Sequence, residues 1–396
     1  MGAEVALRCG RKLEAGLVVV PKGSVDGAAE DGDGKAFGRV FAGQLDGETS
    51  AKVKLVEAAH PLPDASSVTA ARAALRVAGR CGRGDLLVVA LSGGASALMA
   101  MPVPQVTLED KVLVSGALMR AGASIQELNA VRKHLSAVKG GGLLRQARGA
   151  IVLNLVLSDV VGNDLGVVGS GPTAADSSTF AEAISVLKRR GVWGRAPEPV
   201  RGYLEQGAAG MATETLKPED ALSASAINVI VGDNGVALEG AAEQARALGF
   251  KVQRWRALRG QAEDLAVRLA SDLAGAGDHR LCLLGGGEPV VTVRAQGRGG
   301  RAQHLALATA IALDRLGAPA EFAALFAGSD GVDGNSAAAG AFIDGQTLER
   351  AARAGVDARE ELRRFNSNGF FAQTGDLFVT GPTGTNVADL AIALLG

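Results

Sequence analysis

The residues best suited to chemistry lie between positions 285 and 304. The triglycine segment Gly285–Gly287 precedes Glu288, and a second glycine-rich segment contains Arg298 and Arg301. Guanidinium groups bind phosphate and carboxylate oxygens through parallel hydrogen bonds, so two arginines spaced by glycines favour an acidic ligand. A solvated hairpin tip is the alternative, but such a tip rarely needs so many glycines. We interpret the segment as a candidate anion site.

A glycine–hydroxyl turn follows the apolar run Leu86–Leu91. It contains Ser92, Gly93, Gly94 and Ser96. Backbone amides in such a turn can bind a phosphate or an oxyanion. A tight turn that needs positive φ explains the same residues equally well. The sequence leaves both interpretations open.

Asp159 follows the apolar run Ile151–Leu157. It therefore lies at the carboxyl end of a predicted strand, where α/β sheets bind their ligands. Its carboxylate could orient a substrate or a metal ion, or it could only cap the next turn. Residues 169–173 and 381–386 form two further glycine–hydroxyl segments.

Asp330 and Asp333 flank glycine in an acidic loop. The loop lacks the terminal glutamate of an EF-hand, but Mg²⁺ needs only one or two protein carboxylates beside phosphate oxygens. An Asp–Gly turn without a metal is the alternative. The four histidines have no metal-ligand spacing, and neither GxxxxGK[ST] nor GxGxxG at the start of a nucleotide-binding unit is found.

Alternating strand-like and helix-like segments predict an α/β protein. Two helices begin with capping boxes, Thr107 with Asp110 and Ser124 with Glu127. The second helix is predicted to have an apolar face of Leu128, Val131, Leu135 and Val138. The predicted strands, of which 86–91 and 151–157 are expected to be fully buried, are 54–57, 86–91, 151–157, 227–231, 251–254, 281–284, 290–294, 323–326 and 377–379.

Composition excludes several classes of protein. The length of 396 residues predicts two or three domains. The chain is 47% hydrophobic and 21% charged, a composition that excludes global disorder. A net charge of −1 argues against a nucleic-acid partner. No apolar run reaches the length of about 20 residues that spans a membrane, and three widely spaced cysteines indicate a reducing, cytoplasmic location. Residues 24–50 are predicted to be a loop-like insertion, and 207–220 a linker.

Six segments, in this order, resemble the class II glycerate kinases. They are SGGASALMAMP, ASIQELNAVRKHLSAVKGGGL, LSDVVGNDLGVVGSGPT, GGGEPVVTVRAQGRGGRAQHLAL, AGSDGVDGNSAAAG and TGPTGTNVADL, and they cover roughly residues 55–395. The resemblance implies a Rossmann-like α/β/α N-terminal domain over 1–220. A smaller mixed α/β domain would cover 221–396, with a MOFRL region at about 280–390 and the site in the cleft between the domains.

Transfer of the γ-phosphoryl group of ATP to D-glycerate is the activity that the resemblance implies, with 2-phosphoglycerate as product and ATP and Mg²⁺ bound. Arg301 would be the catalytic arginine, and Asp330 and Asp333 would bind Mg²⁺ or the glycerate hydroxyls. The implied substrate- and phosphate-binding residues are Ser92, Gly93, Gly94, Ser96, Asn129, Arg132, Lys133, Lys139, Asp159, Gly171, Thr173, Arg298, Thr385 and Asn386.

The sequence also departs from the family pattern. Family members begin with a strand and a glycine–lysine motif whose lysine is thought to be catalytic, whereas Met1 falls where the next helix should already run. The family segment GGRNQE has Ala302 and His304 here, and Asn335 replaces a usual proline. A truncated member that binds ligand without turnover is therefore one alternative.

A hydroxypyruvate reductase is the other alternative, against which the absence of a dinucleotide fingerprint counts. The sequence leaves open which glycerate hydroxyl reacts, the nucleotide preference, whether Met1 is the true start, and whether the chain forms a homo-oligomer.

Overall fold

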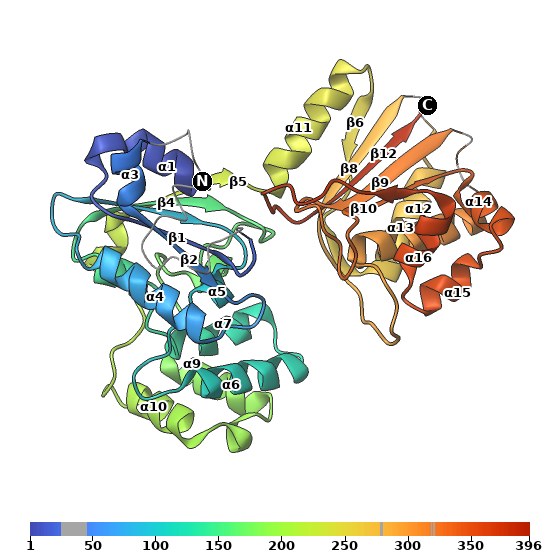
Figure 1. Cartoon of the computed structure of the whole chain (residues 1–396). Helices are drawn as coiled ribbons and strands as arrows, with labels where there is room; N and C mark the ends of the chain where they lie inside the picture. The colour runs from blue at the N-terminus through green and yellow to red at the C-terminus, as the bar shows by residue number, and fades with distance from the viewer. Residues whose placement is uncertain (25–45, 278–279, 318, 320) are drawn as a thin grey trace. The chain divides into compact units, whose positions relative to one another are not determined.

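The computed structural model describes residues 1–24, 46–277, 280–317, 319 and 321–396 and divides them into two compact units (Figure 1). The first unit contains Met1–Val156 and Asn163–Val231, and the second contains Leu157–Gly162 and Gly232–Gly396. The family resemblance implies a change of domain after residue 220. The contacts place residues 221–231 in the first unit, because strand β5 (Ala226–Gly232) pairs with β4 (Ile151–Leu157).

Parallel strands and helices alternate in the first unit, as predicted. Strands β1 (Gly16–Pro21) and β2 (Val53–Ala58) form one parallel pair, and β3 (Leu86–Leu91) joins β4 and β5 in a second sheet. The helices of this unit are α1 (Gly2–Cys9), η1 (Gly10–Lys12), α3 (Gly47–Ala51), α4 (Ala65–Ala78), α5 (Ala95–Leu98), α6 (Leu108–Arg120), α7 (Ile125–His134), α8 (Gly142–Gln146), η3 (Val168–Ser170), α9 (Phe180–Arg189), η4 (Trp193–Arg195), α10 (Glu198–Ala208) and η5 (Ala221–Ser225).

Helices α6 and α7 begin where the capping boxes predict. The backbone amide of Asp110 donates to Thr107 Oγ1 at 3.1 Å, and that of Glu127 donates to Ser124 Oγ at 3.3 Å. The predicted apolar face from Leu128 to Val138 is buried and packs in one cluster with α9 and α10, apart from Val138, which packs against α8 and β4. Because α7 ends at His134, the last two residues of that face lie beyond the helix.

Two predictions for the first unit need correction, and a third lies largely outside the described residues. Strands β3 and β4 have the predicted bounds but are not buried throughout, because Leu86 and Ile151 at their starts are exposed. Residues 207–220 are not a linker, because Leu216 is fully buried and its amide donates to Gly140 O. The predicted loop over 24–50 lies largely outside the described residues, and its described end includes part of α3.

A seven-stranded mixed sheet forms the second unit, with the order β11-β10-β9-β12-β8-β6 and β7 also paired to β8. Its strands are β6 (Lys251–Arg254), β7 (Leu258–Gln261), β8 (Leu281–Val290), β9 (Phe322–Gly328), β10 (Gly340–Asp344), β11 (Leu377–Phe378) and β12 (Asp389–Leu395). Its helices are α11 (Asn234–Ala247), α12 (Ala262–Ala274), α13 (Arg301–Leu316), α14 (Thr347–Arg353), α15 (Ala358–Arg363) and α16 (Ser367–Thr374).

Helix α13 is the central helix of this unit. Every residue from Ala302 to Leu313 is buried, because α12, the sheet and α14–α16 surround it. Helix α11 covers the other face of the sheet, where it contacts Cys282 and Leu284 of β8 (Figure 1). The buried length of α13 fixes the position of Arg301, its first residue.

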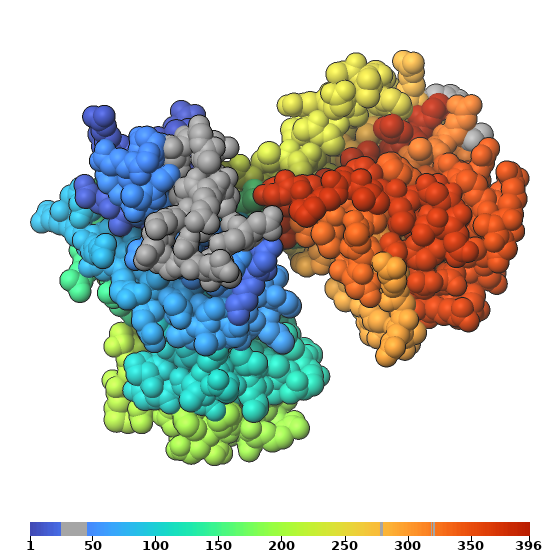
Figure 2. All heavy atoms as spheres, in the orientation of Figure 1, coloured from blue at the N-terminus to red at the C-terminus, as the bar shows by residue number. Residues whose placement is uncertain are grey.

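Strand β8 corrects two predictions at once. The segments 281–284 and 290–294 are not separate strands, because one strand runs from Leu281 to Val290 and the triglycine lies inside it. Residues 292–296, which follow β8, are exposed at the surface of the second unit (Figure 2). No helix in the described ranges has both the length and the apolar character that a membrane span requires.

Candidate functional site

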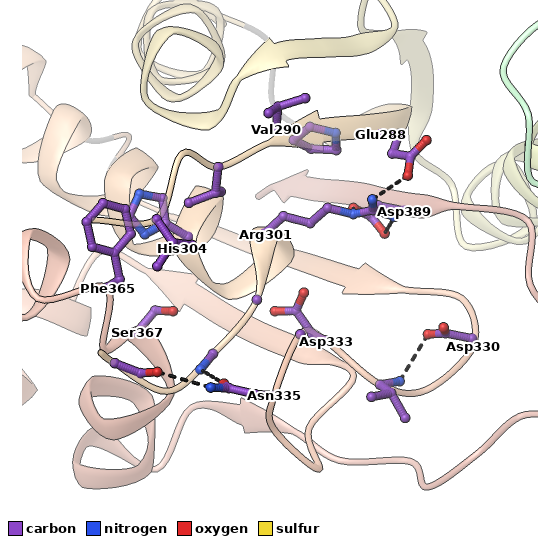
Figure 3. Close-up of a pocket in the computed structure, with 18 of the residues that line it drawn as sticks. Glu288, Val290, Arg301, His304, Asp330, Asp333, Asn335, Phe365, Ser367 and Asp389 are labelled. Carbon is purple, nitrogen blue, oxygen red and sulfur yellow. Dashed lines mark hydrogen bonds and ion pairs between the residues drawn. The ribbon is translucent and has the colours of Figure 1, made fainter. Parts of the chain in front are cut away.

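A pocket of about 640 Å³ lies in the second unit, at the start of α13 (Figure 3). Arg301 and His304 enter it from α13, and Glu288 and Val290 from the end of β8. Its remaining wall comes from the segment between β8 and α13, the loop after β9, the segment at the start of α16 and the start of β12. It therefore lies where six segments of one unit meet.

Arg301 is held in a fixed orientation inside this pocket. Its Nε donates to Asp389 Oδ2 at 2.6 Å and its Nη2 to Asp389 Oδ1 at 3.2 Å. Its Nη1 donates to Glu288 Oε1 at 2.5 Å. Burial lowers the pKa of Arg301, but these two carboxylates outweigh burial and raise it above its usual range. The guanidinium is thus charged and oriented, with N–H groups left for an anion.

Asp389 is the buried partner that orients the arginine. Its carboxylate is held at the first residue of β12, next to β8 and β9. The pKa of Asp389 is raised to about 7, because burial, together with the charges of Asp333 and Glu288, outweighs the opposing effect of Arg301. Glu288, by contrast, is 57% exposed, so an incoming anion could displace it from Arg301.

The triglycine of β8 explains how Asp389 is placed. A Cβ on Gly286 would lie 1.9 Å from Asn234 Oδ1, so only glycine lets Asn234 approach. Asn234 Nδ2 donates to Val387 O at 2.9 Å and to Asp389 O at 3.0 Å. The sequence places Gly285–Gly287 in a candidate anion site, and in the structure these three glycines lie within β8. These glycines permit close packing around the start of β12.

Asp333 and Asp330 differ in what their carboxylates contact. Asp333 is buried and accepts hydrogen bonds from the amides of Ala302 and Gln303, at 3.0 and 2.8 Å, and from Gln303 Nε2 at 2.9 Å. It thereby caps α13, and burial raises its pKa. Asp330 Oδ1 accepts from the amide of Val332 at 3.1 Å. Within the described ranges, no three His, Cys, Asp or Glu residues are grouped as a metal site would require.

Of the other predicted residues in this unit, some line the pocket and some do not. Asn386 lines the pocket, and its Oδ1 accepts from the amide of Ala388 at 3.0 Å. Arg298 and Thr385 have exposed side chains outside the pocket lining. Asp159 is outside the pocket lining; burial raises its pKa, and the charge of Glu288 raises it further while that of Arg301 lowers it.

In the first unit, several predicted residues meet in one chain of hydrogen bonds. Lys139 Nζ donates to Ser96 Oγ at 2.8 Å, which lies 3.1 Å from Ser170 Oγ. Ser170 Oγ in turn donates to Asn129 Oδ1 at 2.9 Å. Burial lowers the pKa of Lys139 well below its usual value, and Lys111 and Arg132 lower it further. Ser92 and Gly93 lie in the turn before Ser96, and Gly94 has the left-handed φ of 82° that the turn predicts.

A second pocket of about 550 Å³ is lined by Asn129, Lys133 and Thr173 of this unit. Lys133 Nζ forms a buried ion pair with Asp176 Oδ1 at 3.2 Å. Asn129 Nδ2 and Thr173 Oγ1 are buried without a hydrogen-bond partner in the described part of the chain. Gly171, with φ 64°, belongs to the left-handed turn just before Thr173, and Arg132 donates to Ser115 Oγ at 3.4 Å.

The sequence missed several residues that complete these sites. Asp389 could have been found from the apolar run Leu390–Leu395, which predicts a strand that begins beside it. Phe365 in the first pocket and Asp176 in the second have no local sequence signal. Their roles depend on contacts with residues far away in the chain.

Two family models match the chain: one described as a domain of unknown function (DUF4147) over residues 1–205, and the MOFRL family over 281–389. A glycerate 2-kinase of Pyrococcus horikoshii is 36% identical over 88% of this chain and 79% of its own. A relative from Agrobacterium vitis, named provisionally as a hydroxypyruvate reductase, is 39% identical over 87% and 78%. The crystal structure of a Thermotoga maritima glycerate kinase matches with a TM-score of 0.83 and 32% identity, over 100% of this chain and 88% of that one.

Proposed function

The chain belongs to the glycerate kinase family with a MOFRL domain, and we propose that it transfers the γ-phosphoryl group of ATP to D-glycerate, giving 2-phosphoglycerate. One observation carries the chemistry: Arg301 is held by the buried Asp389 inside a pocket, with N–H groups left for an anion. Phosphoryl transfer needs little covalent participation by the protein. Positioning and neutralisation of charge supply most of the catalysis.

Arg301 would act on the charge of the transferring phosphoryl group. Because Asp389 fixes the guanidinium before substrate arrives, little reorganisation is needed when charge develops in the transition state. The exposed Glu288 would be replaced at Nη1 by a phosphoryl oxygen. Asp333 supports this arrangement by capping the helix that begins with Arg301.

The residues present fit a Mg²⁺ ion that is held mainly by nucleotide oxygens. Asp330 is the better candidate ligand, because three hydrogen bonds already engage Asp333. Bound Mg²⁺ would neutralise phosphate charge. In the first unit, Asn129, Lys133, Lys139 and Thr173 are proposed to bind substrate or phosphate, and the unpartnered amide and hydroxyl groups there support this.

Phosphorus NMR of a reaction with ATP, Mg²⁺ and D-glycerate tests the proposal. We expect a new phosphomonoester resonance together with ADP. Coupling to a single vicinal proton identifies 2-phosphoglycerate, whereas coupling to a CH₂ group identifies the 3-isomer. The proposal would be contradicted if the chain folds cooperatively but forms no phosphoglycerate. It would also be contradicted if ADP appears only in reactions that lack D-glycerate. NADH absorbance with hydroxypyruvate checks the activity for which the Agrobacterium relative is named.

The pKa of Asp389 predicts an acid limb in the activity. A carboxyl group whose pKa is raised to about 7 is ionised only above that pH, and Arg301 needs the ionised form. We therefore expect kcat/KM to fall as pH decreases through about 7. Asp389→Asn should lose about ten- to hundredfold of activity and remove this limb.

The check is a kcat/KM profile from about pH 5.5 to about 9. Asp272→Asn, at an exposed position of α12, is the matched control and should keep the wild-type profile. An unchanged acid limb in Asp389→Asn would show that another group causes it.

A further inference from the structure

The pocket beside Arg301 has two chemically different ends (Figure 3). Phe365 lies at one end and Asp330 at the other, with Arg301 between them, and Val290 and Val293 also line the pocket. Val290 and Val293 are 50% and 65% exposed. Large apolar side chains exposed together beside a pocket indicate a ligand or a partner rather than a core. The occupant therefore needs both an apolar part and an acidic part.

The aromatic wall of the apolar end is built in advance. Phe365 stacks on the buried His304, with ring centroids 5.3 Å apart and planes 6° apart. His304 Nε2 is fixed by Glu263 Oε1 at 3.0 Å. A flat ring held by a second flat ring presents a rigid surface, which lowers the entropy lost when a planar ligand stacks.

The backbone of Phe365 also holds an unfavourable conformation. Its φ of 56° is left-handed, which is rare for an aromatic residue. Gly297 packs against it so closely that a Cβ there would lie 2.1 Å from Phe365 O. Strain that the surrounding structure maintains is concentrated at functional sites. The position of this ring is therefore a property that the fold maintains.

The size of the pocket distinguishes between D-glycerate and the nucleotide as its occupant. A pocket of about 640 Å³ lies in the range of sites for drug-sized ligands. D-glycerate has three carbons, all bearing oxygen, so it would neither fill this volume nor use the valines. A purine nucleotide has a planar base for the apolar end and phosphates for Arg301.

We propose that this pocket binds the purine base of the nucleotide against Phe365, Val290 and Val293, with its phosphates directed to Arg301. The assignment rests on the proposed function, because it takes the phosphoryl donor to be a nucleotide. It gives the second unit the role of nucleotide binding. It also gives Phe365 and His304 a role that the family resemblance did not assign to them.

Binding of two partial ligands to the full chain tests the assignment by calorimetry. Adenosine has the base without phosphates, and inorganic tripolyphosphate has phosphates without the base. Phe365→Leu should weaken adenosine about tenfold, the size of one base–aromatic stack, and leave tripolyphosphate unchanged. Arg301→Lys should show the reverse pattern. Phe342→Leu, on a partly exposed ring of β10 outside the pocket, is the matched control.

A second variant tests the assignment even if Phe365→Leu fails to fold. Val293 is exposed, so Val293→Asp leaves the core intact and should raise the KM for ATP about fivefold while the KM for D-glycerate stays constant. Equal adenosine affinity in the wild-type chain and in both variants, or a rise in the KM for D-glycerate alone, overturns the assignment. Turnover with unchanged adenosine binding would contradict only this inference. Nucleotide binding that depends on Phe365 without phosphoglycerate formation would contradict only the proposed function.

Discussion

Replacing Arg301 with lysine is expected to lower kcat for glycerate phosphorylation by about 10²- to 10³-fold, the loss typical of one preorganised charge-stabilising donor. Lysine keeps the positive charge but cannot make the parallel bonds that join Nε and Nη2 to Asp389. Its ammonium group would lie on a flexible stem without a fixed direction toward the phosphoryl group. The loss should therefore appear mainly in kcat, with a smaller change in the KM for D-glycerate.

Steady-state kinetics of Arg301→Lys and Arg315→Lys measure this effect. Arg315 lies exposed near the other end of α13, so its variant controls for any effect of the substitution on the helix. Arg301→Ala with added guanidinium ion is the sharper test, because a free guanidinium can occupy the space beside Asp389. Partial recovery of kcat is expected. A loss below about threefold in Arg301→Lys would remove Arg301 from the catalytic role.

Sequence patterns predict those features of the structure that depend on interactions between residues close together in the chain. The capping boxes at Thr107 and Ser124 located two helix starts, because their hydrogen bonds join residues three positions apart. The helical period likewise predicted the burial of Leu128 and Val131. The glycine-spaced segment indicates both Arg298 and Arg301 as anion-binding candidates, and the structure places Arg301 in a pocket.

Long-range packing decided what the sequence could not predict. Gly286 belongs to the segment that the sequence indicates as a candidate anion site, but in the structure it permits a close approach by Asn234, which is 52 residues away in the chain. A glycine reports that a Cβ is not tolerated, but it does not say which neighbour excludes it. Arg298 resembles Arg301 in spacing, yet Arg301 has Asp389 as its partner while Arg298 stays exposed. Partners of this kind become visible only when distant strands are paired.

The burial of Lys111 is a second feature that the sequence does not predict. Of the substitutions proposed for this chain, we expect one at Lys111 to have the largest effect on stability. Lys111 lies on α6, is 5% exposed, and its Nζ has no hydrogen-bond partner in the described part of the chain. Burial, with a smaller contribution from the charge of Arg132, lowers the pKa of Lys111 to about 7. In the unfolded chain the same group titrates near its ordinary value, about 10.4. Between these two values the unfolded chain binds a proton that the folded chain does not.

The free energy of unfolding should therefore rise by about 1.4 kcal/mol per pH unit between pH 7 and 10 from this group alone. Below the folded pKa the full penalty is present, and above the unfolded pKa it disappears. Lys111→Met, which fills a similar volume without a charge, should be more stable by about 1–4 kcal/mol near pH 7. It should also show a shallower dependence on pH than the wild-type chain.

Urea unfolding of both chains at several pH values between about 7 and 10 measures the two slopes. Their difference isolates Lys111 together with its effect on the pKa of Lys139, because the titrating groups that Lys111 does not influence are the same in both chains and cancel. Lys54→Met, at an exposed position of β2, is the matched control and should keep the wild-type slope. Equal slopes for Lys111→Met and the wild-type chain would mean that the ammonium stays charged in the folded state. In that case water or an anion must reach Lys111, and added phosphate should then stabilise the wild-type chain more than the variant.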